Sequence, residues 1–526
     1  MSLLKDKMPV FGGSTNSLSQ TPTKWKKPYD ILSVWQGYWF IFVSAWLPIS
    51  ISAVWIGIIV GLIFWAATSF LALRIVLDEM PKDGSIKPFA HVRAKLLAIA
   101  GCDDAPLLIP LGIFTLVIMI GAFCVPLVDG KTAADGLRVA TRTLVSLKAL
   151  VVYPWVYQVL RRSAGAKTPA ICVFLLISSL SCLYAPIEPS MKEYLRNITD
   201  NPPQDQNWLI VYHMTDGFIR WVTGSRTDYL QGTGFLEQPM AFAGQMQTVM
   251  MMALALLLCG GYKWLPGVFC KRSTAILIAC CVTVGIIFGA ERSAWLGVIF
   301  GVIVVCASVS RKMVLASLAS LLVLGCLSYL FVPIVKDRVD VLFKSQEKGT
   351  AIFQGSNSGP FKDPSVIARF HIWEATIDKF KQKPIFGSSL IRFGVIHAKS
   401  AMPDKGYFDH AHSNYLHMLA ATGLVGFAAY LYLLYSIFST TVKLSRPIFP
   451  EGLTEIEAQK LKFERSVAIG LLAASVSLAV SGLFEFNFGT GHVRLTYFYW
   501  LAFLSLSSYR DPQSMRNQEK LGAPTM

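Results

Sequence analysis

Long apolar runs recur along this chain from Trp39 to Tyr499, and only short charged segments separate most of them. A helix needs about 20 apolar residues to cross the hydrocarbon core of a bilayer. Of the 526 residues, 53% are hydrophobic and 15% are charged, and the mean hydropathy of +0.50 lies far above the soluble globular range. The sequence therefore predicts an all-α, polytopic integral membrane protein.

The apolar runs divide into about twelve predicted transmembrane helices. The region from Gly37 to Leu77 is too long for one span, and we divide it at Pro48. A single span there would reverse the side of every later segment. The predicted spans are 36–54, 56–76, 106–128, 141–160, 168–187, 240–261, 273–290, 294–310, 313–334, 413–438, 466–484 and 493–509.

The positions of basic residues test this division, because cytoplasmic loops carry an excess of Lys and Arg. With the N-terminus inside, all of the following fall on the cytoplasmic side: Arg93, Lys95, Arg161, Arg162, Lys167, Lys263, Lys271, Arg272, Arg311, Lys312, Lys443, Arg446, Lys460, Lys462 and Arg465. The net charge of +16 therefore marks one membrane face and does not indicate a nucleic-acid partner.

The same boundaries divide the chain into tails, helical blocks and two long outer loops. The N-terminal tail contains lysines but no apolar core, so we predict a disordered basic tail and no cleaved signal peptide. The predicted parts are a cytoplasmic tail 1–35, transmembrane helices in 36–187, a periplasmic loop 188–239, transmembrane helices in 240–335, a large periplasmic loop 336–411, transmembrane helices in 412–509 and a cytoplasmic tail 510–526.

The large loop between the ninth and tenth predicted spans contains a helical pattern from Pro364 to Phe386. Its apolar residues recur at helical spacing with charged residues between them, and Pro384 and Gly387 end the pattern. We predict an amphipathic helix lying on the membrane surface. The ten cysteines fall in apolar runs or short connections, which predicts no disulfide framework.

Polar residues gather at the outer mouth of the tenth predicted span, in Phe408 to Gly426. His410 and His412 belong to this group, and a histidine accepts a proton near neutral pH, which suits a general base acting on a hydroxyl. The alternative is a polar helix start, with Ser413 and Asn414 as caps and both histidines at the membrane interface only. The local pattern leaves both interpretations open.

A second group is the predicted outer turn between the seventh and eighth spans, Gly289 to Gly297. Charged residues at membrane depth are costly and usually face a cavity or a partner, so Arg292 is a candidate anion ligand and Glu291 its counter-charge. The alternative is a plain interfacial turn.

A third group, Phe218 to Pro239, carries Arg220 and Arg226, whose guanidinium groups can bind diphosphate without a metal. A solvated loop explains this segment equally well. Further polar residues on the same face are explained by salt bridges or lipid headgroup contacts; they are Arg369, His371, Glu485, His492 and Arg494.

Several motifs of other enzyme classes are absent from the sequence. There is no P-loop, no GxGxxG, no HExxH, no Cys/His metal spacing and no acidic run suited to a catalytic metal. We therefore predict neither nucleotide-sugar chemistry, nor a metal, nor another cofactor.

Four segments together resemble the O-antigen ligase and O-antigen polymerase superfamily with its Wzy-type C-terminal signature. Arg369 to Gly387 resembles an Arg-x3-Trp helix that leads to Pro-x2-Gly, and His412 to Gly426 resembles a histidine helix that ends in Gly-Leu-x-Gly. Glu291 to Gly297 and Gly232 to Ala243 resemble the family's arginine turn and its glycine- and proline-containing entry to a span.

The resemblance implies a GT-C-like, metal-independent membrane glycosyltransferase in a bacterial inner membrane, with its active site facing the periplasm. Its donor would be a glycan linked to undecaprenyl diphosphate. The acceptor would be lipid A-core for a ligase, or a second carrier-linked glycan for a polymerase of O-antigen or exopolysaccharide. Membrane lipids would surround it, and the sequence does not predict an oligomeric state.

Residue by residue, His412 matches the base that activates the acceptor hydroxyl, and Arg292 matches an arginine that holds the donor diphosphate. Either Arg220 or Arg226 corresponds to a second family arginine, while Arg369, His410 and Glu291 are candidate substrate-binding residues. Ser413 stands where many family members have Asn.

Two other classes of function compete with this interpretation. A transporter or flippase predicts charged or broken helices near the bilayer midplane and internal repeats. A scaffold for polysaccharide assembly predicts that the outer arginines and histidines are dispensable.

Overall fold

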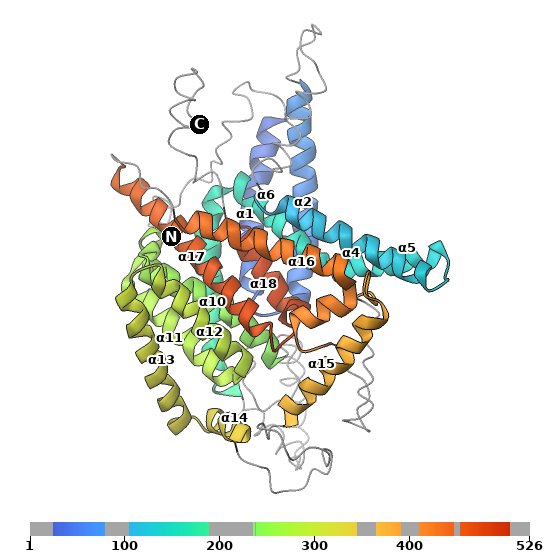
Figure 1. The fold of residues 1–526 in the computed structure, drawn as a ribbon. Helices are drawn as coiled ribbons and strands as arrows, with labels where there is room; N and C mark the ends of the chain where they lie inside the picture. The colour runs from blue at the N-terminus through green and yellow to red at the C-terminus, as the bar shows by residue number, and fades with distance from the viewer. Residues whose placement is uncertain are drawn as a thin grey trace, which may run out of the picture.

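The computed structural model describes residues 25–78, 105–188, 235–236, 238–343, 364–390, 410–446 and 453–504. Within these ranges the chain is helical and has no strand, and its long helices pack side by side (Figure 1). Arg220 and Arg226 lie outside the described residues.

The helices follow one another in this order: α1 (Lys26–Trp46), α2 (Ile51–Asp78), α4 (Leu108–Val128), α5 (Ala133–Ser146), α6 (Val152–Arg162), α7 (Lys167–Tyr184), α10 (Pro239–Leu258), α11 (Arg272–Gly289), α12 (Arg292–Ala307), α13 (Arg311–Phe331), α14 (Pro333–Phe343), α15 (Pro364–Gln382), α16 (Asn414–Ser445), α17 (Glu455–Ser481) and α18 (Gly491–Leu501). Short 3-10 helices, among them η8 (Asn487–Gly489), join several of them.

Every predicted span overlaps one of these helices or a pair of them. Among the described residues, 8 helices are long and apolar enough to cross a membrane, or up to 9 if α5 and α6, bent by 53°, form one broken span. The helix α12 is apolar but has only 16 residues, and α18 has 11. A multi-pass membrane protein is therefore supported, and the count of about twelve spans stays a prediction.

The first apolar stretch is broken where Pro48 interrupts it. The helix α1 ends at Trp46 and α2 begins at Ile51. The two helices pack against each other, and the indole N–H of Trp39 donates to the carbonyl of Gly57 at 2.7 Å. A proline lacks the amide hydrogen that a continuous helix needs there, so the chain turns back on itself.

The centre of the molecule is built from α10, α12 and α17, which pack closely through small residues. A Cβ on Gly297 would lie 2.5 Å from the carbonyl oxygen of Ser477, and one on Gly301 would lie 2.4 Å from the Met251 sulfur. Close backbone approach at small residues is typical of helix packing in membranes.

The helix predicted in the large loop is present as α15 and ends at Gln382. It lies beside α16 (Figure 1). The helix α16 is longer than the predicted span and is broken at Gly423, where φ is 65° and ψ is −172°. Both features bear on the site, because the break holds the segment that follows α15.

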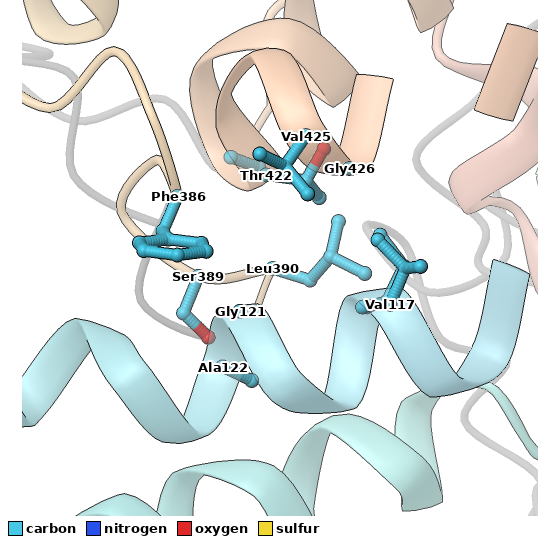
Figure 2. A pocket seen from close by; sticks show the side chains of 11 residues that line it. Val117, Gly121, Ala122, Phe386, Ser389, Leu390, Thr422, Val425 and Gly426 are labelled. Carbon is cyan, nitrogen blue, oxygen red and sulfur yellow. The ribbon is translucent and has the colours of Figure 1, made fainter. Parts of the chain in front are cut away.

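The segment that follows α15 and the break in α16 are joined by backbone hydrogen bonds, which we call the clasp. The amide of Leu424 donates to the carbonyl of Pro384, and the amide of Ser389 donates to the carbonyl of Ala421, both at 2.8 Å. Figure 2 shows the small pocket beside the clasp, where Phe386, Ser389 and Leu390 face Thr422, Val425 and Gly426 of α16 and residues of α4. The clasp fixes α15 against the first turns of α16.

Candidate active site

His412 immediately precedes the N-cap residue of α16, and the turn between α17 and α18 lies against it. The Nδ1 atom of His412 lies 3.2 Å from Oε1 of Glu485. The amide of Asn414 donates to the carbonyl of Gly482 at 2.7 Å, and the Asn414 side-chain oxygen accepts from the amide of Phe488 at 2.9 Å. The start of α16 is thereby clamped to the turn that carries Glu485.

The predicted helix cap is present, and the histidines beside it make contacts of their own, so the cap does not decide between the two interpretations of this segment. Ser413 is the N-cap residue, and its hydroxyl accepts from the amide of Leu416 at 3.4 Å. His412 has φ of 46°, a left-handed conformation that is uncommon for a residue other than glycine. Strained backbone of this kind is often found at functional sites.

His410 packs against His412. The centroids of the two rings are 4.2 Å apart, and Nδ1 of His410 accepts from the amide of His412 at 3.4 Å. His410 also lies near the ring of Phe486, at 5.9 Å between centroids. Both imidazoles therefore meet the turn between α17 and α18.

Glu485 is the carboxylate around which these groups gather. Its side chain is only 7% exposed, and its Oε1 accepts from the amide of Phe486 at 3.0 Å. Burial raises the pKa of Glu485, but the hydrogen bond with His412 and the charges of His412, Arg369 and His410 outweigh it, so that the pKa is lowered overall. Glu485 is thus held in its charged form.

The Arg-x3-Trp pattern of α15 braces the same segment from its other side. Nη2 of Arg369 lies 3.5 Å from Oε2 of Glu485, and the indole N–H of Trp373 donates to the carbonyl of Ala411 at 3.0 Å. Residues four positions apart share one face of a helix. One face of α15 therefore contacts both Glu485 and the residue that precedes His412.

Arg292 begins α12 and joins three helices. Its Nη2 donates to the hydroxyl of Ser365 in α15 at 2.8 Å, and its Nη1 lies 3.5 Å from the carbonyl of Arg338 in α14. The turn before it reverses at Ala290, whose φ is 52°. This reversal places Glu291 and Arg292 at the end of α12 that α14 and α15 approach.

Glu291 links the arginine group to the histidine group electrostatically. Burial and the nearby charge of Glu485 raise the pKa of Glu291 to about 7, although Arg338, Arg369 and Arg292 act in the opposite direction. Three guanidinium groups therefore share one region with two carboxylates, and one of these is only partly ionised at neutral pH. The region carries an excess of positive charge suited to an anion.

Residues 275–431 match the model of the family described as O-antigen ligase. This match supports the O-antigen ligase and polymerase superfamily. The family match and the apolar helices indicate a multi-pass membrane glycosyltransferase of the ligase or polymerase type, whose substrates are glycans and lipid-linked molecules. No curated protein matches the chain.

The matched segment contains most of the candidate residues. Five of them come together around Glu485 and Arg338: Glu291, Arg292, Arg369, His410 and His412. Glu485 lies beyond the matched segment and contacts it from the turn after α17.

The structure adds Arg338 to the candidate site and gives Glu485 a larger part in it than the sequence predicts. In the sequence, a salt bridge or a lipid contact explains Glu485, although an acidic residue next to a predicted outer turn is a usable signal. Arg338 has no distinguishing signal in the sequence, because it stands in a charged stretch at the start of the large loop. Nothing in the sequence pairs either residue with its neighbours in space.

Proposed function

We propose that the protein transfers glycan from an undecaprenyl-diphosphate-linked donor to an acceptor hydroxyl on the periplasmic face of a bacterial inner membrane. The observation that carries this proposal is the contact of His412 with a buried, charged Glu485 beside a group of arginines. The family match supports the reaction class.

His412 acts as the base in this proposal. If Nδ1 of His412 keeps its proton and donates a hydrogen bond to the Glu485 carboxylate, the lone pair of Nε2 is left free to take a proton from the acceptor hydroxyl. The His412 side chain is 22% exposed, so a substrate can reach it. Glu485 then also stabilises the imidazolium that forms.

Arg292, with Arg338 and Arg369 nearby, supplies the positive charge that the donor diphosphate needs. Guanidinium groups bind phosphate oxygens through paired hydrogen bonds and stabilise charge that develops on a leaving group. Arg220 and Arg226 are proposed as further donor contacts. With this charge supplied by arginines, the proposed reaction needs no metal.

The proposed reaction is a single displacement. The acceptor oxygen bonds to the anomeric carbon of the donor as the bond from that carbon to the diphosphate oxygen breaks. The hydroxyl proton passes to His412 Nε2, and undecaprenyl diphosphate leaves with the electron pair of the broken bond. His410 and Glu291 contact the substrates at the edges of this reaction centre.

The deciding experiment uses the purified full chain in detergent with a carrier-linked oligosaccharide as donor. Lipid A-core and a second carrier-linked repeat are offered separately, and the product that forms distinguishes a ligase from a polymerase. Transfer to neither acceptor by correctly folded protein would contradict the proposal.

Single substitutions test the assigned roles. We expect His412→Ala and Arg292→Ala to abolish transfer while the protein still inserts and folds. His371→Ala, a histidine of α15 without an assigned role, is the matched control and should retain transfer. Normal turnover of either test variant would remove that residue from the mechanism, and loss of activity on addition of a chelator would refute metal-free transfer.

A further inference from the structure

We propose that His410, His412 and Glu485 form a binding site for one divalent transition-metal ion of the Zn²⁺ type, and that the bound ion inhibits the protein. The binding site stands on geometry alone, whereas the inhibition rests on the proposed function of His412 as a base.

The three side chains offer their ligand atoms at close range. One such atom from each of them lies within 4.8 Å of the other two, and the His412 Nδ1 to Glu485 Oε1 distance is 3.2 Å. Tetrahedral Zn²⁺ with bonds near 2.0–2.2 Å holds its ligand atoms about 3.3 Å apart. Small side-chain rotations therefore bring the donors into coordination.

The chemistry of the donors selects the class of ion. Two imidazole nitrogens and one carboxylate oxygen suit Zn²⁺ and its neighbours among the transition metals, whereas Mg²⁺ and Ca²⁺ prefer all-oxygen sites. Three protein ligands leave a fourth position for water. The partial exposure of His412, 22%, gives solvent access to that position.

The surrounding backbone holds the donors in place. The indole of Trp373 donates to the carbonyl of Ala411, which lies between the two histidines. The amide of Asn414, two residues after His412, donates to the carbonyl of Gly482. The amide of Phe486 donates to the Glu485 carboxylate. Ligands that are already ordered lose little conformational entropy on binding, and outer hydrogen bonds orient them.

One neighbouring charge opposes the ion. Arg369 lies 3.5 Å from the Glu485 carboxylate and repels a cation placed there. Removal of this charge should therefore tighten binding. This expectation has the opposite sign to the loss of a ligand, so it separates a metal site from general damage to the fold.

Inhibition follows from the two nitrogens of His412. A metal ion on Nδ1 displaces the proton that this nitrogen shares with Glu485, and in neutral imidazole the proton then resides on Nε2. In the proposed reaction, Nε2 must take the proton from the hydroxyl of the acceptor substrate. An occupied site therefore has no base.

The binding test uses the full chain in detergent, with Zn²⁺ alone titrated in competition with a chromophoric chelator. We expect one ion that binds saturably and that excess Mg²⁺ does not displace. His410→Ala and Glu485→Gln should each weaken binding at least about tenfold, Arg369→Gln should tighten it, and His371→Ala should leave it unchanged. Gel filtration and circular dichroism verify the fold of each variant.

Unchanged affinity in His410→Ala and Glu485→Gln would overturn the site. Where transfer activity is present, Zn²⁺ should inhibit it over the same concentration range in which it binds, and a chelator should restore it. Binding without inhibition would overturn the second half of the proposal. Because binding is measured without donor or acceptor, failure of the proposed transferase function leaves the binding result interpretable.

Discussion

At the scale of single residues, Glu485 determines how His412 can act. A carboxylate that accepts from Nδ1 fixes the tautomer and orientation of an imidazole, and it stabilises the positive charge that the ring gains. Glu485 is buried and charged, and its contact with His412 at 3.2 Å has the geometry for this role. We assign it as a positioning residue.

We predict that Glu485→Gln lowers kcat for glycan transfer by roughly a hundredfold or more, with little change in KM for the donor. The amide keeps the size of the side chain but loses its charge and permits the wrong tautomer. Steady-state kinetics with varied donor measure both constants. Glu374→Gln on the exposed face of α15 is the control and should keep the wild-type kcat. An unchanged kcat in Glu485→Gln would argue against a positioning role.

Glu291 makes both the charge of the arginine region and the stability of the fold depend on pH, each in a defined direction. Its pKa of about 7 lies above the ordinary 4.5, so the proton is lost as pH rises through neutrality. Ionisation removes about one unit of positive charge from the arginine region. Because the folded state binds this proton more tightly than the unfolded chain, the fold loses stability as pH rises from about 4.5 to about 7.

We predict that ionisation of Glu291 raises KM for the diphosphate donor by roughly threefold to tenfold between pH 6 and pH 8. This change corresponds to a loss of about 0.6–1.4 kcal/mol of binding free energy. Glu291→Gln should lack this part of the rise and should have the lower KM at pH 8. Its thermal unfolding midpoint should exceed that of the wild type at pH 8 more than at pH 5. Parallel KM profiles for the two proteins would show that Glu291 does not titrate near the donor.

A sequence pattern identifies a candidate site residue only when an unusual residue type occurs at an unusual position. Histidine and arginine next to predicted outer turns are recognisable in the sequence because such groups are rare in apolar surroundings. Glu485 and His412 are separated by 73 positions, and no periodicity links positions that far apart. Helix packing, and not local sequence, brings them into contact.

At the scale of elements, the break in α16 explains two short motifs together. Gly423 and Gly387 both have positive φ, and a Cβ on Gly423 would lie 2.2 Å from the carbonyl oxygen of Ile385. The Pro-x2-Gly and Gly-Leu-x-Gly patterns are therefore the two halves of the clasp that holds α15 against α16. The motifs predicted family membership, but the contact between them needed the structure.

We predict that Gly423→Ala destabilises the protein by at least about 2 kcal/mol, because the methyl group meets backbone and the conformation disfavours any side chain. The thermal unfolding midpoint in detergent measures the loss. Gly325→Ala is the matched control, since Gly325 lies in α13 with nothing within 4 Å of an added Cβ. It should be neutral or stabilising by up to about 1 kcal/mol. Equal midpoints for the two variants would contradict the role of the clasp.

At the scale of the whole molecule, the helices themselves separate the candidate site from the basic ends. The helix α11 begins at Arg272 and ends beside Glu291, and α16 begins beside His412 and ends near Lys443 and Arg446. A helix of 18 residues, the length of α11, is about 27 Å long. His412 contacts Glu485, and Glu291, next to Arg292, lies within reach of the charge of Glu485, whatever the total number of spans.

The sequence predicts membrane-spanning helices well where apolar runs are long and flanked by basic residues. It predicts them poorly where the helices are short. Hydropathy alone does not decide whether α12, α18 or the bent pair α5 and α6 cross the bilayer, because their lengths fall near or below the spanning limit. The side that each later loop faces depends on those decisions. Orientation therefore needs a direct measurement.

We predict that the end of the molecule that carries the site faces the periplasm. In a chain whose native cysteines have been replaced, Glu374→Cys on α15 should react with a membrane-impermeant maleimide added to intact spheroplasts. Lys271→Cys, at the opposite end of α11, should react only after the membrane is opened. Both positions are exposed in the structure, so a difference between them reports sidedness and not burial. Labelling of Lys271→Cys but not Glu374→Cys in closed spheroplasts would place the candidate site in the cytoplasm, where a glycan already carried to the outer leaflet could not reach it.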